Sequence, residues 1–307
     1  MVETVLKTKN ITKKYNNHIA VNNVNMDVKQ GDIYGLVGKN GAGKTTLLRT
    51  ISGLTMASNG EIEMFHETSK DGLNKARMRT GCIIETPNFF PYLSARKNLE
   101  YYRIQKGIVE EKCVDDVLKT VGLEDTGRKK FKNFSLGMKQ RLGLGFAIMG
   151  NPDILILDEP INGLDPTGIV EFRELLLKLN RERNITIIIS SHILGELSQI
   201  ATVYGFIHKG ELVEQISSKE LEEKCKSCLS IKVDDTGKAT VIIENQLNSS
   251  KYQVLSNNEI RLYDYVDTPE LVTKALINDG VMVSSINQIG ANLENYFIDL
   301  IGGVHNA

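Results

Sequence analysis

The sequence is short of cysteine. Its 307 residues include only 4 cysteines, too few and too scattered for a disulfide framework, which agrees with a reducing compartment. Cys225 and Cys228 form a C-x-x-C pair, but they follow a charged segment instead of opening a thioredoxin-like helix, and no second pair supplies zinc ligands. We therefore interpret them as incidental cysteines near a domain junction.

Long hydrophobic runs are also missing. The longest candidates, Ile154 to Leu157 and Ile185 to Ile189, are strand-sized, whereas a helix that spans a bilayer needs about 18–20 apolar residues. The amino terminus, MVETVLKTKN, lacks the apolar core of a signal peptide. We therefore expect a chain that is made and kept in the cytosol.

Neither sign of charge is in excess. The chain has 37 basic and 38 acidic side chains and a formal net charge of −1, whereas nucleic-acid binders usually carry a basic excess. The densest basic run, residues 128–132, contains Phe131 as its one aromatic residue, which is thin support for base stacking. We interpret it as a solvated helix-end face, with contact to anionic lipid or a membrane subunit as the alternative, and we expect no nucleic-acid partner.

The length and the hydrophobic pattern predict two cores, a large α/β domain over residues 1–215 and a smaller domain after it. Three apolar runs, residues 33–37, 154–157 and 185–190, are typical of parallel strands that are covered on both faces. Between the first two runs, in the stretch from about residue 91 to residue 149, apolar residues recur at helical spacing. We predict a helical subdomain inserted there.

The carboxy-terminal part of the sequence has a pattern that predicts a fold different from that of the first domain. Residues 216–228 are expected to form a linker or a helix, and residues 229–307 a small α+β domain. Its elements are expected at Leu229 to Val233, Lys238 to Leu247, Tyr252 to Leu255, Ile260 to Tyr263, Pro269 to Asp279 and Val281 to Ile289. This β-α-β-β-α-β order is ferredoxin-like, and an amphipathic helix from Leu293 to Ile301 is expected to close the domain.

A glycine-rich loop between the first apolar run and a helix-like run from Leu47 carries the strongest chemical signal. The loop consists of Gly38, Lys39, Asn40, Gly41, Ala42, Gly43, Lys44, Thr45 and Thr46. Glycines let the backbone turn with positive φ and bring N–H groups against phosphate oxygens, and a helix that begins near Lys44 adds the positive end of its dipole. Lys44 is expected to reach the β- and γ-phosphates and Thr45 to bind Mg²⁺. The loop therefore predicts a nucleoside triphosphate site.

Two carboxylates, Asp158 and Glu159, follow the second apolar run. They would lie at the carboxyl end of a buried strand, where ligands of doubly wound sheets bind. Asp158 is expected to hold the Mg²⁺ shell and Glu159 to polarise the attacking water, because phosphoryl transfer depends on positioning and electrostatics. A solvated acidic loop is the alternative, which the upstream glycine loop disfavours.

Further motifs occur in a recognisable order. The stretch FSLGMKQR, Phe134 to Arg141, resembles the signature motif of ATP-binding-cassette ATPases. The other matches are Tyr15 ahead of Ala20-Val21 as the adenine-stacking aromatic residue, Gly163-Leu164-Asp165 as the D-loop and Ser190-Ser191-His192 as the switch histidine. The resemblance implies a P-loop NTPase fold with a mixed sheet, and ATP hydrolysis with ATP and Mg²⁺ as cofactors.

The resemblance also implies that one chain provides half a site and that two copies pair head to tail as a homodimer. ATP on Lys44 of one copy would be covered by the signature helix of the other, so that Ser135 and the Gly137 amide meet the γ-phosphate. By itself, a histidine after a strand such as His192 is more often structural. Its position after Ser190-Ser191 in this family implies a γ-phosphate contact.

Glu85 departs from the family pattern, because glutamine is common at this position after the predicted strand Cys82 to Ile84. Leu136 and Met138 likewise stand where glycine and glutamine are usual. A carboxylate near Mg²⁺ binds the metal harder but repels the γ-phosphate. We hypothesise that Glu85 is a metal-side sensor beside the contact with a membrane partner.

The phrase IETPNFFPYL, the signature stretch and the closing ENYF ahead of LIGG narrow the resemblance to the bacitracin-export and lantibiotic-immunity ATPases of Gram-positive bacteria. It implies separate integral-membrane permease subunits, a peripheral position on the inner face of the cell membrane, and export of peptide antibiotics. One alternative is the ATPase of an antibiotic-sensing complex. Another is a soluble ATPase that acts on ribosomes or DNA, against which the single cassette and the lack of heptads argue.

Two regions leave their role open. The aromatic residues between Asn88 and Leu93 either belong to the core of the helical insert or line a groove for a helix of the membrane partner. The acidic residues of the terminal domain, Asp234, Asp235, Asp264 and Asp267, lack the spacing of a metal loop. We expect that domain to have a structural or dimer-supporting role.

Overall fold

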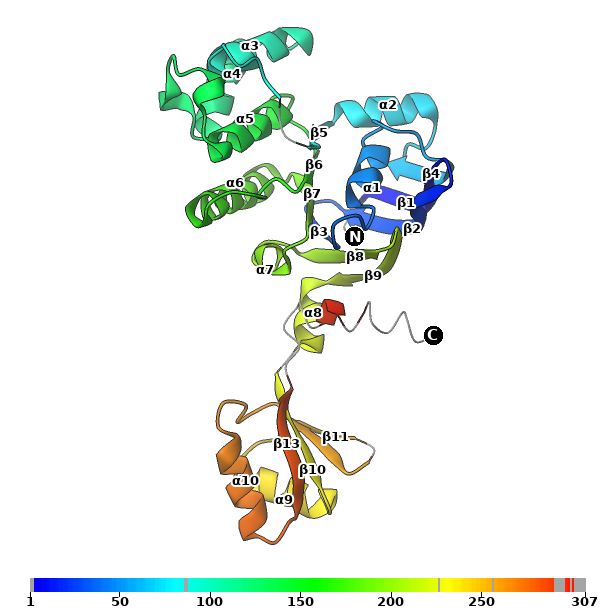
Figure 1. Ribbon diagram of the computed structural model, residues 1–307, viewed down its shortest axis with the longest axis vertical. Coiled ribbons are helices and arrows are strands. Elements are labelled where there is room, and N and C mark those ends of the chain that lie inside the picture. Colours follow the sequence, from blue (N-terminus) through cyan, green and yellow to red (C-terminus); the bar gives the residue numbers. More distant parts are fainter. Residues whose placement is uncertain are drawn as a thin grey trace. The chain divides into compact units, whose positions relative to one another are not determined.

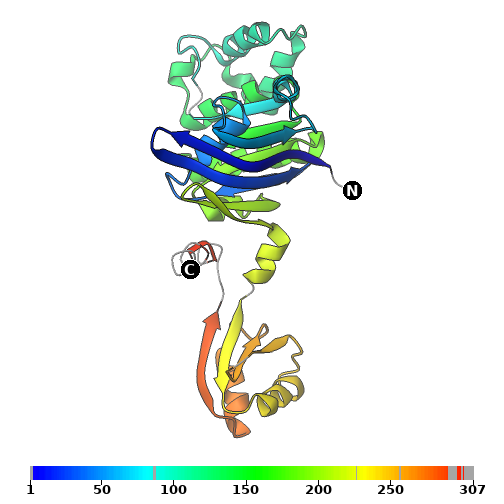
Figure 2. The same ribbon diagram turned by 90° about the vertical axis from the view of Figure 1, so that its right-hand side faces the viewer.

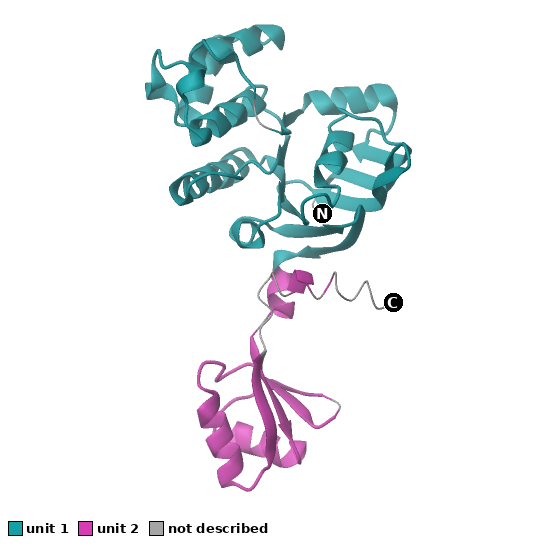
Figure 3. Ribbon diagram, in the orientation of Figure 1, with its two compact units in different colours: residues 1–218 teal, residues 219–307 magenta. Residues whose placement is uncertain are grey.

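The computed structural model describes residues 3–85, 88–225, 227–255, 257–289, 296–298 and 300. The chain divides into two compact units, residues 1–218 and 219–307 (Figure 3). The closing helix predicted from Leu293 to Ile301 lies outside the described residues, apart from 296–298 and 300. Within the described residues, no helix is long and apolar enough to span a membrane.

A six-stranded sheet forms the centre of the first unit (Figure 1). Its order is β5 (Thr80–Ile83), β6 (Ile154–Asp158), β7 (Thr186–Ser191), β3 (Ile33–Val37), β8 (Val203–His208) and β9 (Glu211–Ser217). All neighbours are parallel except β8 and β9, so the sheet is mixed, as predicted. Every residue of β3, β6 and β7 is buried, which confirms that the three apolar runs are strands covered on both faces.

A second, antiparallel sheet has the order β2 (His18–Lys29), β1 (Thr4–Tyr15) and β4 (Asn59–Met64), and the sequence pattern did not predict it (Figure 2). Helix α1 (Lys44–Ile51) connects the two sheets through the core, because Leu47, Leu48 and Ile51 pack in one cluster with residues of both. Helix α2 (Lys70–Met78) follows β4. The glycine loop therefore leads into a helix that is held on two sides.

The chain between β5 and β6 is mainly helical, as predicted. It contains α3 (Ala95–Gln105), α4 (Lys112–Thr120), α5 (Leu136–Ile148) and two short 3₁₀ helices, Glu124–Thr126 and Phe131–Asn133. Serines cap both long helices: Ser94 accepts a hydrogen bond from Lys97 N in α3, and Ser135 accepts one from Met138 N in α5. Helix α6 (Pro166–Arg183) follows β6 with Asp165 as its cap, and α7 (Leu194–Leu197) follows β7.

The second unit contains the predicted ferredoxin-like order. Its elements are α8 (Ser218–Lys224, whose first residue belongs to the first unit), β10 (Cys228–Val233), α9 (Thr236–Asn245), β11 (Tyr252–Leu255), β12 (Glu259–Leu262), α10 (Pro269–Asn278) and β13 (Val283–Ile289). The sheet order is β11-β12-β10-β13 with antiparallel neighbours throughout. Helix α9 begins before the predicted Lys238, because the Asp235 carboxylate accepts a hydrogen bond from the Lys238 amide and caps the helix.

Candidate functional site

The glycine loop between β3 and α1 forms one wall of a cavity of about 360 Å³. The cavity is lined by Tyr15, His18, Ala20, Asn40, Gly41, Gly43, Lys44, Thr45, Thr46 and Glu159. Most of the predicted loop residues therefore line one cavity, together with Tyr15 from the end of β1. His18 was not predicted to line this cavity; it lies there because it pairs with Tyr15 across the β1–β2 hairpin.

Two glycines of the loop have no room for a side chain. A Cβ on Gly38 would lie 2.5 Å from the Ile207 carbonyl oxygen, and one on Gly43 would lie 2.5 Å from the Ala20 carbonyl oxygen. Gly43 also has φ of +105° and caps α1 without any side-chain hydrogen bond. The first amides of α1 are thus left for an anion, which a helix N-terminus favours.

Lys44 is buried, with only 4% of its surface exposed. Its Nζ lies 3.1 Å from Glu159 Oε1 and donates to the Gly38 carbonyl at 2.6 Å. A buried ammonium group needs such compensation, because an unpaired charge is costly to remove from water. A phosphate bound against the loop would compete with Glu159 for this cation.

Thr45 and Asp158 come together from different elements. Thr45 Oγ1 donates to Asp158 Oδ2 at 2.7 Å, and Ser190 Oγ donates to Asp158 Oδ1 at 2.6 Å. A hydroxyl and a carboxylate are the hard oxygen donors that Mg²⁺ prefers, so the predicted pair fits this ion. Ser190 also accepts a hydrogen bond from the Glu159 amide at 2.9 Å. This positioning role was not predicted from the sequence.

Glu159 lies at the centre of the polar cluster. Besides Lys44, its carboxylate contacts His192, whose Nδ1 is 2.8 Å from Glu159 Oε2. The backbone of Glu159 has φ of +45°, a left-handed conformation that is uncommon for residues other than glycine and frequent at functional sites. Its carboxylate can accept a proton from a water molecule beside a phosphate.

Ser135 and Gly137 are not among the residues that line this cavity. The Ser135 hydroxyl accepts a hydrogen bond from the Met138 amide at 3.2 Å. The side chains of Leu136 and Leu164 pack around Gly163 and Gly137, so the start of α5 lies beside the D-loop of the same chain. The γ-phosphate contact expected of Ser135 and Gly137 therefore stays a prediction for a second copy.

Glu85 makes an ion pair with Arg49, which lies one helical turn after Thr45 on α1. Its side chain is 61% exposed, and its backbone has φ of +67°. The structure thus brings Glu85 to a guanidinium group instead of the Thr45–Asp158 pair, and its metal role stays a prediction. Arg49 was missed, although its i+4 spacing from Thr45 places both on one face of the helix.

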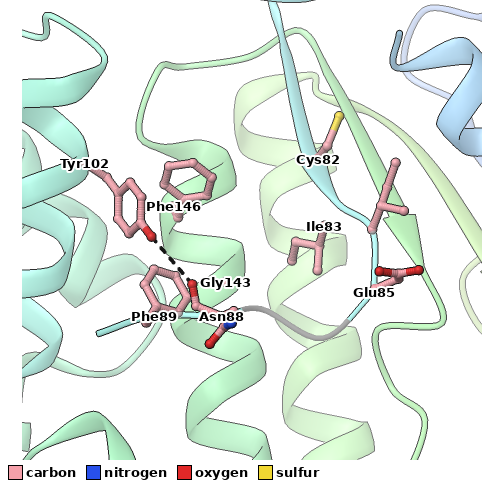
Figure 4. Close-up of a pocket in the computed structure, with 9 residues that line it drawn as sticks. Cys82, Ile83, Glu85, Asn88, Phe89, Tyr102, Gly143 and Phe146 are labelled. Atoms are coloured by element: carbon pink, nitrogen blue, oxygen red, sulfur yellow. Dashed lines mark hydrogen bonds between the residues drawn. The ribbon is translucent and has the colours of Figure 1, made fainter. Parts of the chain in front are cut away.

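A second cavity, of about 200 Å³, opens beside Glu85 (Figure 4). Figure 4 shows Phe89, Tyr102 and Phe146 converging on it, and the Tyr102 hydroxyl donates to the Asn88 carbonyl at 3.5 Å. The ring of Phe89 lies 5.5 Å from that of Tyr102 and 6.3 Å from that of Phe146, with both pairs edge to face. The floor of this cavity is therefore aromatic.

The aromatic residues before α3 divide between the core of the insert and its surface, and the groove for a membrane partner stays a prediction. Phe89 is buried, with 5% exposed, and belongs to the core of the insert. Phe90 and Tyr92 are 41% and 69% exposed. The basic run after the first 3₁₀ helix is solvated, as predicted, because 128–130 and Lys132 are exposed.

The remaining candidates have structural roles. All four cysteines are free, and burial raises the pKa of the Cys82 thiol to about 11. In the terminal unit, Asp235 caps α9, the Asp234 carboxylate accepts from the Met282 amide, and Asp264 pairs with Lys251. The described part of the chain has no group of three or more His, Cys, Asp or Glu side chains that could hold a metal ion.

Known proteins are similar to this chain in sequence. A family model described as "ABC transporter" matches residues 21–162. The bacitracin transport ATP-binding protein BcrA of Bacillus licheniformis is 42% identical over 302 residues, which cover 98% of this chain and 99% of the relative. The chain belongs to the ABC transporter ATP-binding proteins. It is an ATPase, and ATP is its nucleotide. The lantibiotic transport ATP-binding protein SrtF of Streptococcus pyogenes is 42% identical over 224 residues, 71% of this chain and 95% of the relative.

Solved structures confirm the ABC ATPase fold. The structure of cbiO1 from Clostridium perfringens, described as part of the ABC transporter complex cbiONQ, has a TM-score of 0.66 at 28% identity and covers 72% of this chain and 92% of its own. The dimeric ATP-binding cassette MJ0796, bound to ADP and Pi, has a TM-score of 0.63 at 28% identity, covering 69% of this chain and 98% of its own. This ABC ATPase therefore has a P-loop NTPase fold, followed by a ferredoxin-like unit.

Proposed function

We propose that this ABC ATPase drives separate membrane subunits that export bacitracin-like or lantibiotic-like peptide antibiotics and so confer resistance. The observation that carries the proposal is the similarity to BcrA over 98% of the chain, which includes the terminal unit as well as the cassette. The similarity to a lantibiotic transport protein supports the wider substrate class. The Lys44–Glu159–His192 cluster supports coupling to hydrolysis.

In the proposed mechanism, the amides at the start of α1 and Lys44 bind the phosphates, and Tyr15 stacks on the adenine. Thr45 and Asp158 would hold Mg²⁺, which supplies positive charge against the phosphate oxygens when it is bound. Glu159 polarises the attacking water, and its contact with Lys44 gives way to the phosphates. His192, which neighbours Glu159, would contact the γ-phosphate.

We further propose that two copies form the working ATPase. The position of Ser135 and Gly137 supports this. Both lie at the start of helix α5, and neither lines the nucleotide cavity of its own chain. A second copy would place this helix N-terminus over the γ-phosphate, where backbone amides stabilise an anion. The dimeric arrangement described for the MJ0796 cassette also supports it.

The proposed membrane partner is an integral-membrane permease, which holds the ATPase on the inner face of the cell membrane. The aromatic cavity beside Glu85, with Phe90 and Tyr92 exposed near it, supports docking of a permease helix there.

Substitution of the exposed aromatic residues tests this docking surface. Phe90→Ser together with Tyr92→Ser should reduce recovery of permease with the tagged ATPase. Met78→Ser is the matched control, because Met78 is 79% exposed and does not line this cavity. Equal recovery with all three proteins would contradict the docking surface.

Lys44→Ala tests the proposed function. We expect the variant to lose antibiotic resistance in a sensitive host, because Lys44 is the buried cation of the loop whereas Lys39 is exposed. The complex with the permease should stay assembled. Lys178→Ala, an exposed position on α6, is the control that keeps both properties. Minimum inhibitory concentrations and affinity purification measure the two readouts. Wild-type resistance with Lys44→Ala would overturn the proposal.

A further inference from the structure

Glu196 lies on α7, and one oxygen of its carboxylate lacks the hydrogen-bond donor that a buried oxygen needs. Its Oε2 is buried and has no hydrogen-bond partner among the described residues. A buried acceptor without a donor is destabilising, so native proteins keep few of them. Glu196 follows His192 by four residues, on the short helix that comes directly after the histidine. The nearest candidate for the missing donor along the chain is therefore His192.

The charges that act on Glu196 are those of the cluster. Burial raises the pKa of the Glu196 carboxyl, the His192 imidazole lowers it, and the Glu159 carboxylate raises it. The His192 ring is therefore in the electrostatic reach of two carboxylates. Only one of them, Glu159, is hydrogen-bonded to it, through Nδ1 at 2.8 Å.

The local structure holds Glu196 firmly beside the histidine loop. Leu194 and Leu197 are 4% and 0% exposed and anchor the single turn of α7 in the core. At the start of the loop, Ser191 Oγ accepts a hydrogen bond from the Ile193 amide at 2.9 Å. A carboxylate fixed by such anchors keeps its place when the neighbouring ring changes partner.

We propose that Glu196 is a positioning residue for His192 in ATP hydrolysis. When a nucleotide and the attacking water engage Glu159, the Nδ1–H of His192 loses its acceptor, and Glu196 accepts that hydrogen bond in its place. The ring is then held with Nε2 toward the γ-phosphate, as a second carboxylate orients a catalytic imidazole in other enzymes. This inference rests on the proposed roles of Glu159 and His192.

The test uses the full chain with Glu196→Ala, Glu196→Gln and the control Glu182→Gln, which changes an exposed glutamate of α6. We expect kcat for ATP to fall about tenfold or more in Glu196→Ala and less in Glu196→Gln, whose amide oxygen still accepts a hydrogen bond, with KM changed less than about twofold. The imidazole ¹⁵N shifts of His192 should also change in Glu196→Ala with Mg·ADP present. Glu182→Gln should match the wild type in all readouts.

Wild-type kcat in Glu196→Ala would overturn the inference. A lower kcat with unchanged ¹⁵N shifts of His192 would also overturn it, because that result indicates a structural role for Glu196. His192→Ala separates this failure from failure of the underlying roles. An inactive His192→Ala beside an active Glu196→Ala rejects only the role of Glu196. Wild-type turnover in His192→Ala would reject the proposed γ-phosphate contact as well.

Discussion

The Glu159 carboxylate contacts both a lysine and a histidine of the site, so the protein itself orders these side chains. The carboxylate compensates the buried Lys44 ammonium on one side and holds the His192 ring on the other. Its amide is in turn fixed by the Ser190 hydroxyl, which also donates to Asp158. A nucleotide would exchange these contacts for its own instead of ordering a loose cluster, which lowers the entropic cost of binding.

The sequence predicted the residues of this site far better than it predicted their contacts. The glycine loop is contiguous, so its spacing alone identifies Lys44 and Thr45. Ser190 and Arg49 act on residues from other segments, Asp158 and Glu85. Such contacts depend on which strands become neighbours, and a local pattern does not contain that information.

Glu85→Gln tests the departure from the family pattern. The substitution removes the charge that pairs with Arg49 and should leave ATP affinity within about twofold, because Glu85 is not among the residues lining the nucleotide cavity. Turnover stimulated by the permease should change, since Glu85 does line the aromatic cavity. Nucleotide titration and ATPase assays of the reconstituted complex measure both. Unchanged hydrolysis and unchanged transport would reject a sensor role.

At the scale of elements, burial on both faces decides which strands the sequence reveals. Strands β3, β6 and β7 are continuous apolar runs because helices or other segments cover both of their faces. Strand β1 alternates irregularly, because register shifts interrupt its pairing with β2 between Thr8 and Ile11 and again before Lys13. Each bulge moves the following side chains to the other face, so a two-residue period does not persist.

Tyr34 in β3 gives a prediction about strand stability and pH. It is fully buried, and its hydroxyl donates to Gln215 Oε1 of β9 at 3.1 Å. Burial raises the pKa of the Tyr34 phenol, and Asp27 and Asp32 add to the rise. Tyr34→Phe should lower the free energy of unfolding by about 1 kcal/mol near pH 7, the usual net value of one hydrogen bond.

The sign of the pH effect follows from the raised pKa. Above pH ~10 the unfolded tyrosine loses its proton while folded Tyr34 keeps it, so the wild type loses stability as pH rises. Its advantage over Tyr34→Phe should shrink by about 1.4 kcal/mol per pH unit there. Urea unfolding of both proteins at pH 8 and near pH 11 measures this. A difference in unfolding free energy that is independent of pH would show that Tyr34 ionises in the folded chain as readily as in the unfolded chain.

At the scale of the whole molecule, the two units have separate cores and separate sequence signals. The core of the second unit consists of residues from β10 onward, such as Ile231, Ile243 and Leu276. Its fold was predictable from element order alone, since the β-α-β-β-α-β order admits few sheet topologies. Its role was not predictable, because no group of side chains among its described residues carries a recognisable chemistry.

A chain that ends at Ser218 tests this role. We expect it to fold and to bind ATP with wild-type affinity, because the core around α1 and the nucleotide cavity lie wholly within residues 1–218. If the terminal unit supports pairing of two copies, ATP-dependent self-association should weaken about tenfold or more, since two linked contacts bind more tightly than one. Sedimentation velocity of Glu159→Gln in both chain lengths, with Mg·ATP, measures association without turnover. Equal association would show that the terminal unit serves a purpose other than dimerisation, and loss of ATP binding would show that the cassette needs it to fold.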